Sequence, residues 1–460
     1  MSGKLAPPVA GHNNMSAENT NAYWFELDKQ YRIQTRYTYP EAWDRGSGVS
    51  LWDVEDKRYI DFESGQVCVS AGHCHPDYTK AIQQQAAKLV QTGSAYTDPT
   101  QVRLLQKLAE ITPEPFQKSY LACSGSESNE AAIRLARAYT GRIEVVSFSG
   151  NYHGMTEGSW GVTGFGGMYR APYGVTPAGM SFLPTPYTYP VPGKKRFAYR
   201  DPDVVAACIE FCEQMLDSTT SGEPAAIMLE LIQSAAGVRM LPIGFVREIR
   251  RICTERGALL IIDEAQTGMG RLGKWWGFQH YGIVPDIITA SKTLGGGVPL
   301  SAVITSAEIA DKAVERGYRQ SSSHTGDPLL CATGLANIGI IERERLIENV
   351  AAEGAYLKTQ LEAIAASSPI LGEIRGIGFL LGIEVVRSKA GGEPNQEGTE
   401  EITTYCREHG LLTGWWKAKH LAPNIIRIMP PYILDRETTD HALEIIRNAV
   451  SNAGKCGART

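Results

Sequence analysis

The middle of the chain alternates short apolar runs with stretches of helical periodicity. A strand buried inside a parallel sheet is apolar at nearly every position, and a short apolar run bounded by turn signals is typical of one. Helical spacing is clearest over Ser128–Tyr139, where small and apolar residues recur every three or four positions. We therefore predict strands at Ser119–Ala122, Glu144–Phe148, Ala226–Leu229, Leu259–Ile262 and Ile287–Thr289. Strands that alternate with helices indicate a doubly wound parallel sheet of the α/β class over residues 72–325.

The pattern differs on either side of this large domain. Residues 21–71 carry short alternating segments, and Glu55-Asp56 is predicted to be a turn between two strands. From residue 326 the chain becomes helical, Gly376–Val386 then leads into a strand, and helix and strand alternate to the end. This predicts a smaller α/β domain over 326–460, in which the glycine-rich segment Gly391–Gly398 forms a mobile loop.

Composition and charge narrow the kind of protein. The chain has 460 residues, 43% hydrophobic and 21% charged, which is ordinary for a soluble protein of more than one domain. The net charge of −5 gives no electrostatic basis for binding nucleic acid or an anionic membrane. No apolar stretch approaches the roughly 18 residues that span a bilayer, and the polar residues 1–20 are expected to be a flexible tail rather than a signal peptide. Nine cysteines without CxxC pairs favour the reducing cytoplasm over a disulfide framework or a zinc module.

Two of the predicted strands lead into residues whose side chains can take part in a reaction. Asp263 comes directly after Leu259–Ile262, and Lys292 comes three positions after Thr289. In an open parallel sheet, ligands bind beyond the carboxyl ends of the strands, so both side chains are expected to open onto one crevice. A lysine and an aspartate placed there fit pyridoxal 5'-phosphate: the lysine forms the Schiff base and the aspartate holds the proton of the ring nitrogen. Taken singly, each residue also fits a surface lysine or a helix-capping aspartate.

Hydroxyl-rich turns are candidates for binding the phosphate group. Ser124–Glu130 follows a predicted strand and leads into a helix, whose start offers free N–H groups. Gly125 lets the backbone of this turn come close to a ligand. Ser321–Asp327 is a second such turn. A simple serine-rich helix cap is the alternative interpretation of the first turn.

Further candidates stand at or near strand ends. Tyr152 is placed to cover one face of a flat cofactor, although core packing is the commoner role of an aromatic residue. Glu230 and Gln266 are candidates to hydrogen-bond the cofactor ring. Arg427 lies inside an apolar segment, where its guanidinium needs an anion; a substrate carboxylate and a structural ion pair are open alternatives. His73-Cys-His75 lacks a second cluster and predicts a tight turn rather than a metal site.

Together these residues resemble the class III (subgroup II) pyridoxal-phosphate-dependent aminotransferases, and among them the 2,2-dialkylglycine decarboxylases most closely. The resemblance runs from about Trp52 to Pro431, and its most specific motifs surround Asp263 and Lys292. It is carried by Ser64-Gly-Gln66, Gly72–Pro76, Glu127–Ala132, His153–Thr156, Asp263–Gly268, Ser291–Leu294, His324, Asp327–Leu329 and Arg427–Pro431. It implies the aspartate aminotransferase-like fold (fold type I), with a large mostly parallel sheet domain and a smaller α/β domain that residues 21–71 join.

The resemblance also implies individual roles. Lys292 matches the Schiff-base lysine and Asp263 the partner of the pyridinium nitrogen. Gly125 and Ser126 match the phosphate-binding turn, and Ser323 matches a threonine that reaches the phosphate from the other subunit. A homodimer or a dimer of dimers with shared active sites is therefore expected.

A monovalent cation is a further expectation from the resemblance. Ser94, Ser323 and Asp327 match ligands of a structural alkali-metal site in the decarboxylases. Two positions depart from those enzymes at the active site: Tyr152 stands where they have tryptophan, and Ala235 where they have a serine. Tyrosine is the ordinary aminotransferase residue there, so the departures weaken the expectation of decarboxylation but not of cofactor use.

The implied reaction moves an amino group from a small-molecule donor to a 2-keto acid such as pyruvate. If the donor is a 2,2-dialkylglycine that loses carbon dioxide, Gln66 is expected to orient the leaving carboxylate perpendicular to the cofactor ring. Arg427 is expected to hold a carboxylate in the plane of the ring. A plain transaminase with an amine or ω-amino-acid donor is the first alternative, and a non-catalytic scaffold of the same fold is the second.

Overall fold

The largest sheet has seven strands in the order β4-β12-β11-β10-β7-β5-β6. The computed structural model describes residues 19–35, 37–165, 177–188, 198–415 and 422–456. The strands of this sheet are β4 (Phe116–Ala122), β5 (Val145–Phe148), β6 (Met180–Leu183), β7 (Ala226–Leu229), β10 (Leu259–Asp263), β11 (Ile287–Ala290) and β12 (Ser301–Ser306). Only β12 runs antiparallel to its neighbours, β4 and β11. The expected α/β fold with a large, mostly parallel sheet is confirmed.

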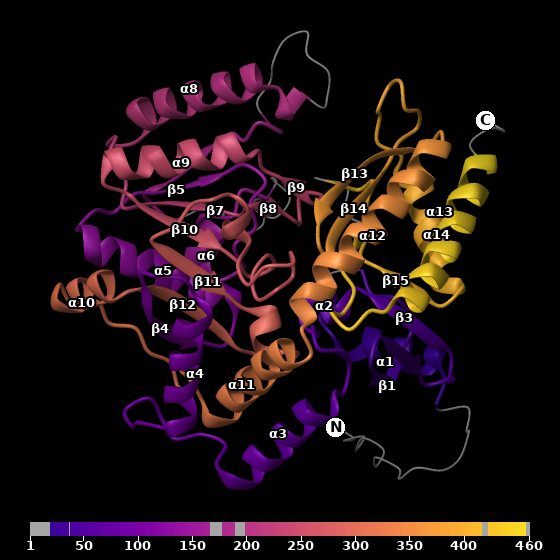
Figure 1. The fold of residues 1–460 in the computed structure, drawn as a ribbon, viewed down its shortest axis with the longest axis horizontal. Helices are drawn as coiled ribbons and strands as arrows, with labels where there is room; N and C mark the ends of the chain where they lie inside the picture. Colours follow the sequence, from indigo (N-terminus) through magenta and orange to yellow (C-terminus); the bar gives the residue numbers. More distant parts are fainter. Residues whose placement is uncertain (1–18, 36, 166–176, 189–197, 416–421, 457–460) are drawn as a thin grey trace, which may run out of the picture.

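Each predicted strand of the large domain is present, within a few residues of its expected bounds. Helices cover both faces of the sheet (Figure 1). They are α4 (Pro99–Ile111), α5 (Gly125–Thr140), α6 (Glu157–Gly161), α8 (Pro202–Thr219), α9 (Ile243–Arg256) and α10 (Ala307–Glu315). The side chains of successive strand residues pack on opposite faces of the sheet. Ile261 packs with residues of α5 and α10, and Ile262 packs with residues of α8 and α9. Burial on both faces explains why these strands are apolar at every position.

The smaller part of the molecule lies on the right of Figure 1 and contains two further sheets. The first has the order β1-β2-β3-β15, and the second β13-β14-β16. Their strands are β1 (Trp43–Ser47), β2 (Ser50–Asp53), β3 (Arg58–Phe62), β13 (Leu371–Ile377), β14 (Leu380–Val385), β15 (Leu411–Thr413) and β16 (Ile425–Ile428). Helices α12 (Leu346–Ser367), α13 (Gln396–Glu408) and α14 (Arg436–Cys456) complete it. Because β15 pairs with β3, the two ends of the chain share one sheet.

The remaining elements connect these parts. They are α1 (Asn21–Tyr31), α2 (Ser64–Val67), α3 (Pro76–Lys88), α11 (Pro328–Arg343), β8 (Ile232–Gln233), β9 (Arg239–Met240), η2 (Ala198–Arg200), η3 (Gly277–His280) and η4 (Lys292–Gly295). Helix α11 touches both cores, since Ile338 packs with the large one and Ile341 with the small one. The domain boundary at 325/326 stays a prediction. The tail expected at residues 1–20 lies, up to residue 18, outside the described residues.

Two local predictions had different outcomes. The turn at Glu55-Asp56 is confirmed, since β2 and β3 pair antiparallel around it. The loop predicted over Gly391–Gly398 was wrong in extent, because α13 already begins at Gln396. Asn395 caps that helix by accepting from the Gly398 backbone N at 3.0 Å, so the third glycine of the segment lies in the first helical turn.

Candidate functional site

Asp263 and Lys292 lie at the carboxyl ends of two neighbouring strands. Strands β10 and β11 are parallel, and Asp263 is in register with Thr289, three residues before Lys292. Lys292 begins η4 with φ of 49°, in the left-handed region. Its positive charge helps to lower the pKa of Asp263 and opposes the burial that raises the pKa of Glu230, which places the three groups in one electrostatic neighbourhood.

The Asp263 carboxylate is buried and hydrogen-bonded on both oxygens. Its Oδ2 accepts from Asn129 Nδ2 at 2.8 Å and lies 2.8 Å from His153 Nδ1. Its Oδ1 accepts from the Ala265 backbone N at 3.0 Å. Burial raises the pKa of Asp263, but the hydrogen bond and charge of His153 and the charge of Lys292 outweigh it, so the pKa is lowered overall. The acid is therefore held ionised.

His153 and Asn129 were not among the site residues predicted from the sequence. Asn129 lies in α5 and also donates to His153 O at 2.7 Å, while its Oδ1 accepts from Thr289 Oγ1 at 2.6 Å. His153 is 2% exposed, and its Nε2 has no hydrogen-bond partner among the described residues. Both residues belong to motifs that carry the family resemblance, which was the available signal, but nothing local shows that they meet at Asp263.

Glu230 ends the run of β7 and is a second buried acid near Asp263. Its Oε1 accepts from the Tyr152 backbone N at 2.6 Å. Burial above all, and then the negative charge of Asp263, raise the pKa of Glu230 well above its ordinary value. The site thus separates two carboxyl groups into an ionised acid and one that favours its neutral form.

An aromatic and apolar wall stands beside Glu230. The ring of Tyr152 meets that of Phe165 edge-on, with centroids 6.0 Å apart, and both pack with Ala235 and Ala236. Ala235, where the decarboxylases have a serine, is therefore part of this wall. The neighbouring Ser234 Oγ is buried and has no hydrogen-bond partner in the described part of the chain.

The glycine turn before α5 packs directly against the Lys292 segment. A Cβ atom on Gly125 would lie 2.9 Å from Ser291 Oγ, closer than real side chains approach. Ser124 caps the helix through a reciprocal bond with Glu127, and Ser126 Oγ accepts from the Met155 backbone N at 3.1 Å. The free N–H groups at the start of α5 therefore point toward the same edge of the sheet as Lys292.

Gln66 lies in α2 and Arg427 in β16, in segments near this region. Val67, next to Gln66, accepts a hydrogen bond from Thr293 Oγ1 at 3.2 Å, which joins α2 to η4. Arg427 lies in β16 and is 8% exposed. Burial lowers the pKa of Arg427, and the charge of Glu63 acts in the opposite sense, so the guanidinium lies close to the segment that carries Gln66.

The residues predicted to bind a cation lie in or beside the turn Ser321–Asp327, which contacts the residue before the glycine turn, since Cys123 Sγ donates to His324 O at 3.5 Å. Asp327 Oδ2 is 2.8 Å from His324 Nδ1, and the Ser323 carbonyl accepts from Gln91 Nε2 at 2.8 Å, which brings their turn to the segment that contains Ser94. Among the described residues, no three His, Cys, Asp or Glu side chains gather as metal ligands. The cation site therefore stays a prediction.

The residues present fit pyridoxal phosphate. Asp263 is a buried acid that is held ionised and could face a protonated ring nitrogen, and the start of α5 at Gly125 packs closely against the segment of Lys292, which carries the amine. Gln266 adds a buried Oε1 that lacks a hydrogen-bond partner in the described structure, as expected of an atom that binds a ligand. None of the described helices has both the length and the apolar character needed to cross a membrane.

Comparisons with known proteins show the family of the chain. The family model described as Aminotransferase class-III matches residues 34–450. Human mitochondrial alanine–glyoxylate aminotransferase 2 is 34% identical over 415 residues, covering 87% of this chain and 80% of that protein. The acetylornithine aminotransferase of Caldanaerobacter subterraneus subsp. tengcongensis is 33% identical over 430 residues, covering 92% and 98%. The structure of taurine:2-oxoglutarate aminotransferase from Bifidobacterium kashiwanohense, in complex with PLP and glutamate, aligns with a TM-score of 0.87 at 26% identity, covering 95% and 98%.

Proposed function

Because the chain belongs to the class III aminotransferases and uses pyridoxal phosphate, we propose that it moves an amino group from an amine or ω-amino-acid donor to a small 2-keto acid such as pyruvate. The observation that carries this proposal is the pair formed by Lys292 and the buried, ionised Asp263 at the carboxyl ends of adjacent strands. A scaffold without activity has no need to hold an acid charged in a buried position, because taking a charge out of water costs free energy that its partners only partly offset.

Each part of the cofactor has a proposed holder in the site. Lys292 would bind the aldehyde, Asp263 the ring nitrogen, and the turn of Gly125 and Ser126 the phosphate. Tyr152 would cover one face of the ring. Hydrogen bonds to the ring complete the set and would come from Glu230 and Gln266. When bound, pyridoxal phosphate supplies an aldehyde that joins the donor's amine and a protonated ring that withdraws electrons from its α carbon.

The remaining work falls to side chains of this protein. Lys292 Nζ would take the proton from the carbon that bears the donor's amino group and would deliver it to the carbon of the cofactor's former aldehyde group. The carboxylate of Asp263 would keep the ring nitrogen of the cofactor protonated, and the positive charge of the ring makes the donor's proton easier to remove. His153 in turn keeps Asp263 ionised. Arg427 would hold the keto acid's carboxylate bidentately.

The relatives support amino transfer but leave the donor open. Their names point to alanine, acetylornithine and taurine as substrates of different members. A small keto acid is favoured on the acceptor side, since an arginine such as Arg427 binds the carboxylate that all 2-keto acids share.

Decarboxylation-dependent transfer from a 2,2-dialkylglycine is the second candidate. The observation that favours it is the link between the Gln66 segment and η4 through Val67 O and Thr293 Oγ1. A neutral amide beside Lys292 would orient a carboxylate without the ion pair that resists loss of carbon dioxide. Tyr152 and Ala235 favour the plain transaminase.

Two measurements test the proposal. Borohydride reduction followed by peptide mapping should fix the cofactor at position 292, and Lys292→Ala should lose visible absorbance, while Lys274→Ala, outside the site, should keep it. 2-Aminoisobutyrate with pyruvate then separates the two reactions: carbon dioxide release identifies the decarboxylating enzyme. Alanine formed from other donors without gas identifies the transaminase. Cofactor fixed at another lysine, or nowhere, would overturn both.

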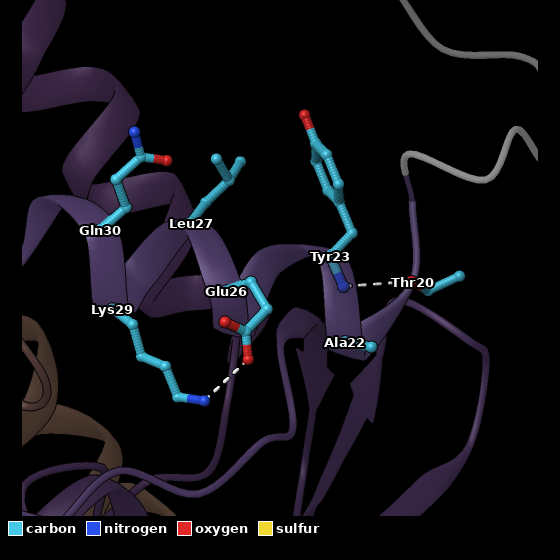
Figure 2. A pocket seen from close by; sticks show the side chains of 7 residues that line it. All are labelled: Thr20, Ala22, Tyr23, Glu26, Leu27, Lys29 and Gln30. Carbon is cyan, nitrogen blue, oxygen red and sulfur yellow. Dashed lines mark hydrogen bonds and ion pairs between the residues drawn. The ribbon is translucent and has the colours of Figure 1, made fainter.

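A homodimer with shared active sites is the proposed assembly. Helix α1, described along its whole length, buries none of its residues, yet it carries Trp24 and Tyr31, which are 45% and 77% exposed. Tyr23 and Leu27 project from this helix beside a shallow hollow of about 780 Å³ (Figure 2). Exposed aromatic residues in one segment indicate a covered surface. Light scattering should find a dimer that Trp24→Ser with Tyr31→Ser weakens and Phe211→Ser, on α8, does not.

Ser323 and the cation ligands belong to this proposed assembly. Ser323 would reach the phosphate of the partner subunit, and Ser94, Ser323 and Asp327 would bind a monovalent cation. Activity that depends on potassium or sodium, and loses that dependence in Asp327→Asn, would support the cation site. The eight cysteines with described side chains are all free, which supports a reducing compartment, for which we propose the cytoplasm.

A further inference from the structure

The segment that carries Gln66 has an unusual backbone. Ser64, Gly65, Gln66 and Val67 have φ of 44°, 56°, 62° and 70°, so four consecutive residues lie in the left-handed region. Only glycine enters that region without strain, and a β-branched residue such as Val67 is a clear outlier there. A left-handed turn of this length persists only where its surroundings hold it.

Asp61 holds one side of this left-handed turn. Its Oδ1 accepts from the backbone N of Glu63 at 2.8 Å and of Ser64 at 2.9 Å, and its Oδ2 accepts from the backbone N of Gly65 at 3.2 Å. His73 Nε2 lies 2.8 Å from the same Oδ2. Asp61 is 1% exposed at the end of β3. A buried carboxylate that accepts from three successive amides determines the path of the chain that follows it.

The other side of the turn is tied to the Lys292 segment. Thr293 Oγ1 donates to Val67 O at 3.2 Å, and Thr293 is the residue next to Lys292. Ser64 Oγ donates to Met429 O at 2.7 Å and accepts from Arg271 Nη2 at 3.3 Å. Lys292 is itself left-handed, so two strained segments meet at this hydrogen bond.

We propose that Asp61 is a positioning residue for the reaction: through the left-handed turn Ser64–Val67 it sets the place of Gln66, and through Val67 and Thr293 it sets the place of Lys292. This rests on the proposed function in that Gln66 and Lys292 must act at the cofactor. Asp61 acts only through these residues. A reacting amine displaced by about 1 Å loses as much as about 100-fold in rate, so the path of this turn matters to the chemistry.

Asp53 provides a matched control. It is also a buried aspartate of the four-stranded sheet, 2% exposed, and it also accepts from two backbone amides, those of Glu55 at 3.0 Å and Lys57 at 2.9 Å. It organises the hairpin between β2 and β3, whereas Asp61 organises the turn that is bonded to Thr293. Loss of either carboxylate should lower stability, but only loss of Asp61 should reach the Lys292 segment.

The test compares Asp61→Asn with Asp53→Asn. The amide nitrogen that replaces one oxygen cannot accept a hydrogen bond, so Asp61→Asn loses part of its hold on the turn. We expect faster hydrogen exchange of the peptide spanning residues 62–69 in the cofactor-free protein, a changed visible spectrum after loading, and a kcat lowered by about 10- to 100-fold with a smaller change in KM. Asp53→Asn should keep the wild-type spectrum and kcat.

A second variant keeps the test decisive if Asp61→Asn does not fold. Thr293→Val removes the bond to Val67 with little change of shape and should alter the spectrum and kcat in the same direction, whereas Thr293→Ser should restore both. Wild-type spectrum and kcat in Thr293→Val, or in a folded Asp61→Asn, would overturn the positioning role. If the wild-type protein itself binds no cofactor at Lys292, the proposed function fails instead.

Discussion

His153 Nδ1 lies 2.8 Å from Asp263 Oδ2, and both side chains are almost wholly buried. The contact joins a histidine that follows β5 to an aspartate that ends β10, with α5 supplying Asn129 to the same oxygen. It explains how a carboxylate can stay ionised in a position where burial alone would raise its pKa. An acid that is ionised at every working pH is what a protonated cofactor ring needs as its partner.

Removal of His153 should make cofactor retention depend on pH. In the wild-type protein the pKa of Asp263 is lowered, so its charge is fully present above the ordinary aspartate pKa of about 3.9 and is lost only as the pH falls through a still lower value. In His153→Ala, burial dominates and raises that pKa, so the cofactor should be released as the pH falls from 8 toward 5. Visible absorbance after dialysis at each pH measures this. His280→Ala, outside the site, should show the wild-type profile, and equal retention by both variants would refute the role of His153.

Glu230→Gln should change how stability varies with pH. The pKa of Glu230 is raised in the folded protein, so between the unfolded value of about 4.3 and the folded value the native state binds more protons than the unfolded state. Stability then falls as the pH rises through that window, by up to about 1.4 kcal/mol per pH unit. Glutamine cannot ionise, so the unfolding temperature of the cofactor-free variant should exceed that of the wild type by a margin that grows with pH. A margin that stays constant would count against a neutral Glu230.

Gly125→Ala should weaken both folding and cofactor binding. Its Cβ would stand 2.9 Å from Ser291 Oγ, so the Ser291 hydroxyl has to rotate away or the turn or the Lys292 segment has to shift. Overpacking of this kind costs roughly 1–3 kcal/mol. Gly244→Ala in α9 is the control, because apart from its chain neighbours and the backbone of its own helix no described atom lies within 4 Å of the added Cβ, and it should stabilise the protein by about 0.5–1 kcal/mol. Chemical denaturation of both cofactor-free variants gives the comparison, and similar effects of the two changes would mean that the turn is not tight.

Arg427→Lys should raise the KM for the keto acid by roughly 10- to 100-fold, because a bidentate, charge-assisted pair of about 1.5–3 kcal/mol becomes a single contact. The kcat at saturating keto acid should change less, since binding and not proton transfer is affected. Steady-state kinetics with pyruvate measure both. A donor without a carboxylate serves as the internal control, because its KM should not change. A fall in kcat alone would mean that Arg427 has a structural role.

The strands and the position of the key pair could be predicted from the sequence. Burial on both faces leaves a local mark, a run in which every residue is apolar, so β7, β10 and β11 were predicted within a residue of their bounds. A residue that directly follows such a run must lie at the edge of the sheet, so the sequence alone predicts that Asp263 and Lys292 lie together.

Predictions of local structure failed where residue types alone do not determine the path of the backbone. The glycines of Gly391–Gly398 indicated a loop, but capping by Asn395 starts α13 two residues before the last of them. Strand β12 was not predicted at all, and its antiparallel direction could not have been, because an apolar run buried in a sheet looks the same in either direction.

The order of residues along the chain determined the fold class, the strands and the place of Asp263 and Lys292, because each depends on local burial or on a strand's end. Tertiary structure alone decided that Asn129 and His153 contact Asp263. It also decided that Asp61 accepts hydrogen bonds from the left-handed turn Ser64–Val67, and that Val67 accepts one from Thr293. Most of these contacts join segments tens to hundreds of residues apart. Their free energy depends on distances of a few ångströms, and only the folded chain sets those distances.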